Sequence, residues 1–193
     1  MRKVIVNEFL ALDGTAQAPG GPEEDTSGGF RHGGWHMQYG DDGSGVAKLI
    51  DEAGGFLLGR RTYEIFAGYW PNAPEETQAI AEPLNTKPKH VASKTLTGSL
   101  EWQNSTVLEG DLPEAVAALK REDGGDLLVI GSTALVQSLI QHGLVDEFRL
   151  MIDPILVGGG KRIFPDDGEL RPLRLVDHRA TSTGVLIATY APA

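Results

Sequence analysis

The sequence predicts an α/β protein built on a mixed central sheet. Through most of the chain, apolar runs typical of buried strands alternate with segments of helical periodicity, and the run at 127–130 has no polar interruption. After Gly143 the pattern changes to alternating strand segments separated by turns, which is typical of antiparallel pairing. We therefore expect a mainly parallel sheet flanked by helices that ends in antiparallel strands.

Length and composition limit the classes of protein that this chain can be. The chain has 193 residues, of which 40% are hydrophobic, and this suits one domain spanning residues 1–193. Its net charge of −10 argues against a nucleic-acid-binding surface, and the lack of cysteine excludes disulfides, thiolate nucleophiles and cysteine-bound zinc. Because no stretch approaches the roughly 20 apolar residues of a membrane helix and no signal sequence precedes the first strand, we expect no membrane partner and a cytoplasmic location.

The first half of the chain alternates between β-rich and helix-periodic segments. Val46, Leu49, Ile50 and Ala53 recur at the spacing of one helical face, and Ser44 precedes them as a suitable N-cap. The expected elements are strands at 4–12, 56–58, 90–92 and 106–108, and helices at 44–53, from near Thr62 to the break at Trp70-Pro71, and at 75–84.

A glycine-rich stretch at 14–43 interrupts this order. A loop of that length inside a compact domain is usually a functional lid or a disordered insertion. Its aromatic residues Phe30, Trp35 and Tyr39 favour a segment that docks on the domain. For residues 19–29, a flexible insertion is an equally open interpretation.

The second half of the chain gives clearer signals. Asp111 is expected to cap a helix that has Pro113 in its first turn, and this helix ends before Gly124-Gly125. The strand at 127–130 then leads through the turn at 131–133 into a helix that ends near His142. The remaining strands are expected at 148–152, 173–176 and 185–190.

Three strand ends carry residues suited to binding an anion. The strongest is Gly59–Thr62, where two arginines and a hydroxyl stand at a helix start, although an ordinary cap with solvated arginines explains the local pattern equally well. The turn Gly131–Ala134 has the order of a phosphate cradle but lacks the glycines of a dinucleotide fingerprint. The third, Ser93–Thr95, can hold a phosphate ester or be a plain strand end.

A pair of carboxylates, Asp41 and Asp42, precedes the first helix. They are either dipole-favoured surface caps or the acidic floor of a substrate site. His32 and His36 lie four residues apart in the glycine-rich loop and share no helical face, so we expect no metal site there.

The order of these motifs resembles a known family. The motifs are L-D-G at 12–14, G-R-R-T-Y at 59–63, V-A-S-K at 91–94, L-V-I-G at 128–131, G-L-V-D-E at 143–147 and G-G-G at 158–160. As an ordered set, they resemble the dihydrofolate reductase-like family, in particular the reductase (C-terminal) domain of bifunctional riboflavin-biosynthesis deaminase-reductases and its stand-alone members. The resemblance spans nearly the whole chain and implies the dihydrofolate reductase-like fold.

The resemblance also implies an NADPH-dependent reductase. The cofactor-binding residues that it carries over are Gly59, Arg60, Arg61, Thr62, Ser93 and Lys94 at the adenine-ribose phosphates, Gly131, Ser132, Thr133 and Ala134 at the pyrophosphate, and Ala16 and Gln17 beside the nicotinamide. Ser132 stands where the family usually has a second glycine, which puts the close approach of the backbone in question. Asp42 matches approximately the carboxylate that supports proton delivery in dihydrofolate reductases.

The implied substrate is a pyrimidine-, pterin- or ribosylamine-like small molecule, with 5-amino-6-(5-phosphoribosylamino)uracil as one candidate. Folate is disfavoured because the Pro-Trp signature of folate sites is absent, and a zinc deaminase in this chain is excluded because its ligands require cysteine. A non-catalytic nucleotide- or small-molecule-binding protein that retains the fold is the alternative. A flavodoxin-like domain fails to explain the strand-rich C-terminal part.

Relatives of this kind commonly pair, so we expect a homodimer. The C-terminal strands offer apolar edge residues for such an interface, namely Val185, Ile187 and Tyr190.

Overall fold

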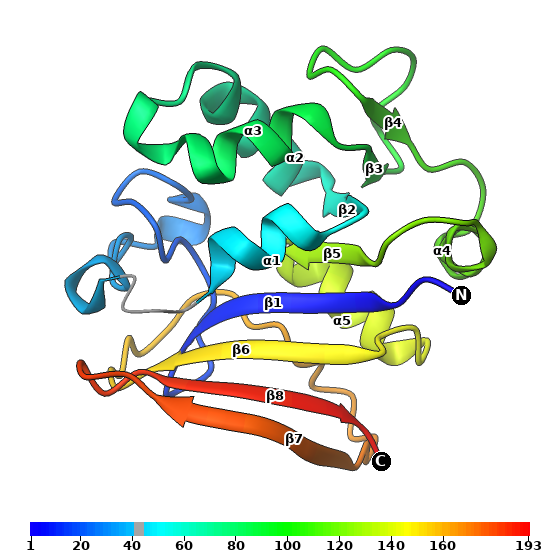
Figure 1. Cartoon of the computed structure of the whole chain (residues 1–193). Coiled ribbons are helices and arrows are strands. Elements are labelled where there is room, and N and C mark those ends of the chain that lie inside the picture. The colour runs from blue at the N-terminus through cyan, green and yellow to red at the C-terminus, as the bar shows by residue number, and fades with distance from the viewer. Residues whose placement is uncertain (41–44) are drawn as a thin grey trace.

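The computed structural model describes residues 1–40 and 45–193, and it is organised around one eight-stranded sheet (Figure 1). The strand order is β4-β3-β2-β5-β1-β6-β8-β7. The strands are β1 (Val4–Ala11), β2 (Gly55–Gly59), β3 (Lys89–Ala92), β4 (Ser105–Val107), β5 (Leu127–Ile130), β6 (Glu147–Asp153), β7 (Leu173–Ala180) and β8 (Leu186–Pro192). Neighbours from β4 to β6 run parallel, and β8 pairs antiparallel with both β6 and β7. The predicted mixed sheet with antiparallel C-terminal strands is confirmed.

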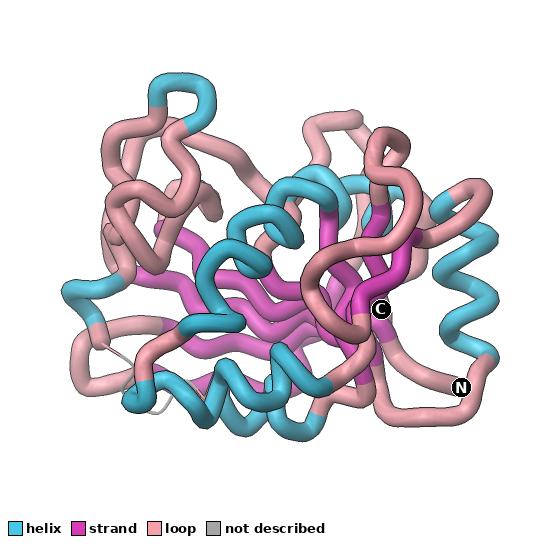
Figure 2. The backbone as a smooth tube through the Cα atoms, turned by 90° about the horizontal axis from the view of Figure 1, so that it is seen from above, coloured by secondary structure: helices cyan, strands magenta, loops and turns pink. Residues whose placement is uncertain are grey.

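Helices cover the parallel part of the sheet (Figure 2). The helices are α1 (Val46–Glu52), α2 (Arg60–Tyr69), α3 (Gln78–Thr86), α4 (Leu112–Arg121) and α5 (Thr133–Gln141). Two apolar cores form, one with α4 and α5 and the other with α1, α2 and α3. Val4 and Val6 of β1 belong to the first core and Ile5 to the second, so the two cores lie on opposite faces of the sheet.

Several element boundaries differ from the prediction. The helix predicted at 75–84 begins with a short 3-10 turn at Glu75–Thr77, continues as α3 from Gln78 to Thr86 and accommodates Pro83. Asp111 stands at the N-cap of α4, but its side chain makes no capping hydrogen bond. Ser44, the predicted cap of the first helix, lies outside the described residues. The strand predicted at 173–176 extends to Ala180 because pairing with β8 continues along it.

The prediction that Val185, Ile187 and Tyr190 form apolar edge material is wrong. β8 lies between β6 and β7, so Val185 is buried, and Ile187 and Tyr190 pack against the two cores. The outer strand at this end of the sheet is β7, next to β8 and the C-terminus (Figure 1). Its exposed apolar residues are Leu173, Leu175 and Val176.

The glycine-rich stretch docks on the domain over its described residues, 14–40. The side chain of Trp35 is buried, and its indole Nε1–H donates to the backbone oxygen of Gln17 at 2.8 Å. A Cβ built on Gly160 would meet the ring of Phe30 at 2.9 Å, so this glycine lets the stretch approach closely. No helix within residues 1–40 and 45–193 combines the length and the apolar character that crossing a membrane requires.

Candidate functional site

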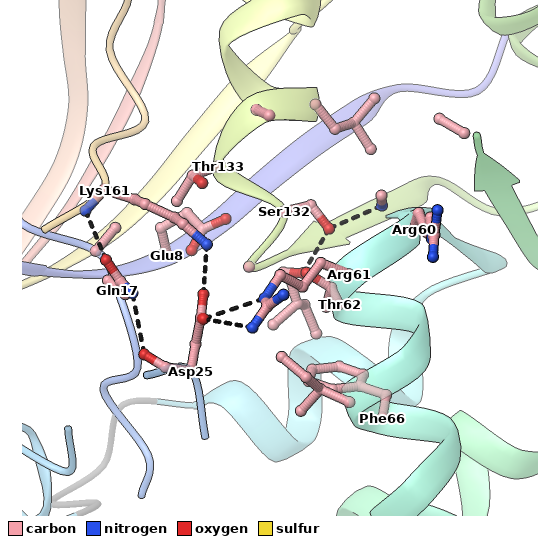
Figure 3. Close-up of a pocket in the computed structure, with 18 of the residues that line it drawn as sticks. Glu8, Gln17, Asp25, Arg60, Arg61, Thr62, Phe66, Ser132, Thr133 and Lys161 are labelled. Atoms are coloured by element: carbon pink, nitrogen blue, oxygen red, sulfur yellow. Dashed lines mark hydrogen bonds and ion pairs between the residues drawn. The ribbon is translucent and has the colours of Figure 1, made fainter. Parts of the chain in front are cut away.

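A large cleft opens where the parallel strands end. Because β1, β2, β3 and β5 run in the same direction, their carboxyl ends meet at one edge of the sheet, which is where open α/β sheets bind ligands. The cleft has a volume of about 1480 Å³. Single-ligand pockets usually measure roughly 300–1,000 Å³, so this cleft has room for two ligands side by side. Figure 3 shows its polar centre.

Every residue that the resemblance carried over for cofactor binding lines this cleft: Ala16, Gln17, Gly59, Arg60, Arg61, Thr62, Ser93, Lys94, Gly131, Ser132, Thr133 and Ala134. Their role in cofactor binding stays a prediction. Asp42, the predicted catalytic carboxylate, lies outside the described residues.

Two helices begin at the cleft, each directly after a buried strand. β2 leads through Gly59 into α2, and β5 leads through Gly131 and Ser132 into α5. The first backbone N–H groups of a helix have no partner within the helix, so such a start favours an anion. The two starts are joined, because the backbone N–H of Gly59 donates to Ser132 Oγ at 2.9 Å.

The turn after β5 has an unusual backbone. Gly131 has φ of 61° and Ser132 has φ of 66°, so two consecutive residues are left-handed. A Cβ on Gly131 would lie 3.3 Å from the side chain of Thr62. Ser132 therefore adopts the conformation that a second glycine would adopt, and its hydroxyl adds a link to β2.

Arg60 belongs to a polar cluster at the ends of β2 and β3. Its Nη1 donates to Thr95 Oγ1 at 2.6 Å, and its Nε donates to Glu64 Oε1 at 2.7 Å. Ser93 Oγ accepts the backbone N–H of Thr95 at 3.1 Å. Lys94 is exposed beside this cluster. A guanidinium, an ammonium and two hydroxyls at one place form a donor set suited to a phosphate ester.

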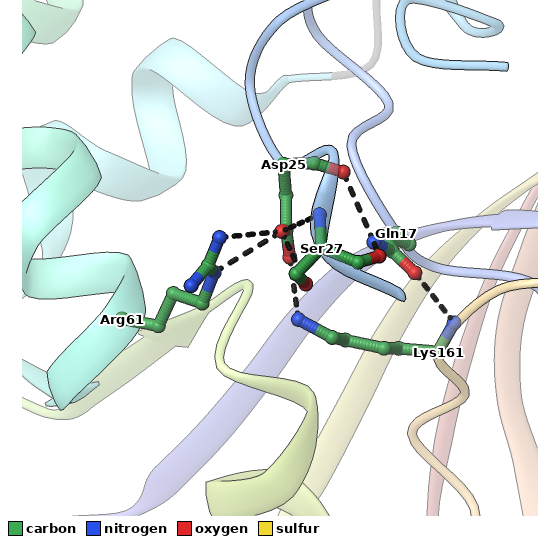
Figure 4. Close-up of polar contacts among 5 residues, drawn as sticks. All are labelled: Gln17, Asp25, Ser27, Arg61 and Lys161. Carbon is green, nitrogen blue, oxygen red and sulfur yellow. Dashed lines mark hydrogen bonds and ion pairs between the residues drawn. The ribbon is translucent and has the colours of Figure 1, made fainter. Parts of the chain in front are cut away.

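Arg61 has a different setting, shown in Figure 4. Its Nη2 lies 3.0 Å from Asp25 Oδ1, and Lys161 Nζ donates to Asp25 Oδ2 at 2.6 Å. Burial favours the neutral acid, but hydrogen bonds from Lys161 and Ser27 outweigh it and lower the pKa of Asp25 to about 2. Arg61 thus connects α2 to the glycine-rich stretch through a charged carboxylate.

Gln17 organises the same stretch. Its Nε2 donates to the backbone oxygens of Asp25 and Ser27, at 3.0 Å each, and its Oε1 accepts the backbone N–H of Lys161 at 3.1 Å (Figure 4). The backbone N–H of Ala16 donates to the backbone oxygen of Lys161 at 2.8 Å. The side chain of Gln17 therefore holds the wall of the cleft together.

Glu8 of β1 also lines the cleft, and the sequence analysis missed it. Its side chain is buried, with 3% of the residue exposed, and Oε1 has no hydrogen-bond partner among the described residues. Burial raises the pKa of Glu8 well above its usual range, and Glu24 adds to this, while the backbone N–H of Gly131 opposes it. A carboxylate in the middle of a mainly apolar strand was the signal that could have found it.

His36 borders the cleft as part of a buried pair. Its Nδ1 lies 2.8 Å from Oδ2 of Asp153, which is fully buried, and its ring packs against Phe9 with centroids 4.1 Å apart. The other end of the cleft is largely apolar and lies against α1, α2 and α3. Its apolar lining residues are Val46, Ile50, Ile65, Phe66, Tyr69, Trp70, Ile80 and Leu84.

The topology and the ligand cleft at the strand ends define a dihydrofolate reductase-like fold. The chain belongs to the RibD C-terminal domain family, whose model matches residues 2–187. It is 28% identical over 192 residues to the uncharacterized protein YyaP of Bacillus subtilis (strain 168), covering 98% of this chain and 94% of YyaP.

Solved structures share the fold. A Shewanella sp. PV-4 protein that is provisionally named as a riboflavin biosynthesis protein has a TM-score of 0.74 at 20% identity, covering 99% of both chains. Dihydrofolate reductase from Enterococcus faecalis, in complex with NADP(H) and RAB-propyl, has a TM-score of 0.62 at 15% identity, covering 98% of this chain and 96% of the reductase. Family and solved structures together support a reductase-type fold.

Proposed function

We propose that this protein is an NADPH-dependent reductase that transfers a hydride to a pyrimidine-, pterin- or ribosylamine-like small molecule. One observation carries the proposal. The cationic end of β3 and the amide-lined turns after β2 and β5 open into a single cleft, with Arg60, Lys94 and Gly131 in its lining. The reductase family and the NADP(H) complex of a protein with the same fold support it.

The residues present fit this cofactor. Arg60, Ser93, Lys94 and Thr95 would hold the 2′-phosphate, because they supply charged and hydroxyl donors at the ends of β2 and β3. Residues 131–134 would hold the pyrophosphate at the start of α5, and Ala16 and Gln17 would border the nicotinamide end. When bound, NADPH supplies the hydride.

The protein's own contribution is positioning and exclusion of water. The stretch from Ala16 to Asp25 lines one wall of the cleft and is tied to α2 through Arg61. The opposite end, with Phe66 and Trp70, gives an apolar wall to a flat substrate. Such an arrangement lowers the barrier by aligning the reacting carbons in a dry site.

The test uses the two arginines separately. Arg60→Ala should weaken NADPH binding at least tenfold and leave NADH binding within twofold, because only NADPH carries the 2′-phosphate. Arg61→Ala should change both cofactors alike, because Arg61 is bound to Asp25. Isothermal titration calorimetry measures both affinities, and Arg121→Ala, at the exposed end of α4, is the matched control. Equal binding of NADPH and NADH by the unaltered protein, with a silent Arg60→Ala variant, would refute the proposal.

The riboflavin precursor 5-amino-6-(5-phosphoribosylamino)uracil is the first substrate to assay. Oxidation of NADPH at 340 nm, an ordinary absorbance assay, reports its turnover. If NADPH binds but neither this compound nor a series of pterins and pyrimidine ribosides is reduced, the alternative applies, namely a binding protein that retains the fold.

We further propose that the protein forms a homodimer, through β7 rather than β8. As the outer strand, β7 presents unpaired backbone groups together with exposed Leu173, Leu175 and Val176. A second copy can pair with this edge about a two-fold axis and bury the apolar side chains of both strands. Light scattering at the monomer mass would contradict it.

A further inference from the structure

We propose that Glu8 is the group that delivers the proton in the reduction. This inference rests on the proposed reductase function. Glu8 points into the cleft from the middle of the sheet (Figure 3). It is 3% exposed, and its Oε1 has no hydrogen-bond partner among the described residues. A carboxyl that lines a cleft and has a buried oxygen without a hydrogen-bond partner costs stability, so we expect it to serve the ligand.

The sheet register explains why Glu8 reaches the cleft. On one side, Glu8 is aligned with Leu150 of β6. On the other side, the last residue of β5, Ile130, is aligned with Asn7, so β5 ends one residue short of Glu8. The chain turns away there at Gly131. Glu8 therefore lies where the turn proposed to hold the pyrophosphate leaves the sheet.

The surroundings of Glu8 favour its neutral form. Burial raises its pKa, and the carboxylate of Glu24 raises it further. The two cations of this region, Arg61 and Lys161, are both bound to Asp25. Besides Glu8, the titratable and charged groups that line the cleft are Glu23, Glu24, Asp25, His36, Arg60, Arg61, Tyr69, Lys94, Asp111, His142 and Lys161.

The other acids of the cleft are less suited to this role. Asp25 is held ionised by its two ion pairs. Glu24 Oε2 accepts the backbone N–H of Gly20 at 2.7 Å and so maintains the fold of the loop. His36 contacts Asp153 and packs against Phe9. Phe9 follows Glu8 in β1, so the side chains of Phe9 and Glu8 lie on opposite faces of the strand.

The step balances without a further reactant. The electrophilic carbon of a C=N or C=O bond accepts the hydride from NADPH, which becomes NADP⁺. The O–H bond of the Glu8 carboxyl breaks as an N–H or O–H bond forms on the neighbouring atom of the substrate. The Glu8 carboxylate then regains a proton from solvent water.

The test compares Glu8→Gln with Glu8→Asp. Glutamine keeps the size of the side chain but has no acidic proton, whereas aspartate keeps the acid on a shorter stem. Glu8→Gln should slow single-turnover oxidation of bound NADPH by 5-amino-6-(5-phosphoribosylamino)uracil, or by the first pterin or pyrimidine riboside found active, at least 100-fold. Its dissociation constant for NADPH should stay within twofold. Glu101→Gln, at an exposed position outside the cleft, is the matched control and should keep the rate.

Two readouts separate proton delivery from a structural role. The rate of the unaltered protein should fall as the pH rises through the pKa of Glu8, Glu8→Asp should keep such a fall at a lower rate, and Glu8→Gln should lack it. In the free protein at about pH 5.5, where a glutamate of ordinary pKa 4.5 is mostly ionised, the infrared spectrum of the unaltered protein minus that of Glu8→Gln should contain the C=O band of a protonated carboxyl.

Each contrary result has a distinct meaning. An infrared difference spectrum without that band overturns the role of Glu8 whatever the activity. If Glu8→Gln does not fold, the spectrum of Glu8→Asp is subtracted instead, and the same conclusion applies. A Glu8→Gln variant with an unchanged pH profile, or with NADPH affinity lowered tenfold, also overturns it. If the band is present but no compound is reduced by the unaltered protein, the proposed function fails and the role of Glu8 fails with it.

Discussion

The left-handed Ser132 allows two effects at one turn to be measured separately. Its hydroxyl accepts the backbone N–H of Gly59, and its φ of 66° is costly for any residue with a Cβ. Ser132→Ala removes the acceptor and keeps the backbone cost. Ser132→Gly removes the acceptor and the backbone cost together.

The magnitudes follow from this difference. Loss of the hydrogen bond at 2.9 Å between Gly59 N–H and Ser132 Oγ should lower the free energy of unfolding by about 1 kcal/mol in both variants. Glycine recovers roughly 1–2 kcal/mol of left-handed strain but gives back roughly 0.5–1 kcal/mol through the flexibility of its unfolded chain. Taking the middle of each range, Ser132→Gly should be more stable than Ser132→Ala by about 0.75 kcal/mol.

Urea unfolding followed by circular dichroism measures these differences. For a chain of this size, 1 kcal/mol corresponds to roughly 2–4 °C in melting temperature, so thermal unfolding gives a second measurement. Ser99→Ala, at an exposed loop position, is the control for the loss of a hydroxyl. Equal stability of the alanine and glycine variants would refute the strain argument, and two variants as stable as the unaltered protein would refute the role of the hydrogen bond.

Three further predictions concern charged and apolar groups. Asp25→Asn should lower the free energy of unfolding at pH 7 on the order of 2 kcal/mol, because folding lowers the pKa of this carboxyl from 3.8 to about 2. The carboxylate's contribution is complete above pH 3.8 and is lost as the pH falls through 2. Chemical unfolding from pH 7 to pH 2 should therefore show the difference in stability between the variant and the unaltered protein disappearing. Burial lowers the pKa of Lys89 from 10.5 to about 8, so the unfolded chain binds more protons than the folded protein between these pH values. The stability of the unaltered protein relative to Lys89→Met should therefore rise with pH in this range, by up to about 1.4 kcal/mol per pH unit. Parallel plots of stability against pH for the two proteins would contradict this. Leu175→Lys places a charge on exposed β7 and should give a monomer by light scattering, with the fold unchanged by circular dichroism, whereas a dimer of unchanged strength would exclude the β7 interface.

The sequence was informative wherever periodicity and turn residues agree. The run at 127–130 is a buried strand because both of its faces are covered, and uninterrupted apolar runs are typical of that environment. The order of strands in the sheet could not be predicted in this way, because it depends on pairing between segments far apart in the sequence. For that reason the apolar residues of β8 were taken for an edge, although β7 occupies it.

The candidate site was predictable to the extent that it follows from local motifs. Glycine and hydroxyl residues after β2, β3 and β5 converge because parallel strands end at one edge. Glu8 and Asp25 carry no such motif. The setting of Glu8 comes from its register with β5, and that of Asp25 from a contact with Lys161, 136 residues further along the chain. Only the folded chain therefore brings them to the cleft.

The consecutive arginines show how a helix start separates neighbouring residues. At 3.6 residues per turn, side chains of adjacent residues leave the helix about 100° apart, and Arg60 and Arg61 accordingly have different partners. Arg60 faces Thr95 after β3, whereas Arg61 faces Asp25 of the glycine-rich stretch. We therefore expect the proposed choice of NADPH over NADH to depend on Arg60, and Arg61 to hold the stretch that lines the cleft. Arg61→Ala should accordingly increase limited proteolysis within residues 14–40, whereas Arg60→Ala should not; equal cleavage of the two variants would mean that the arginines share one role.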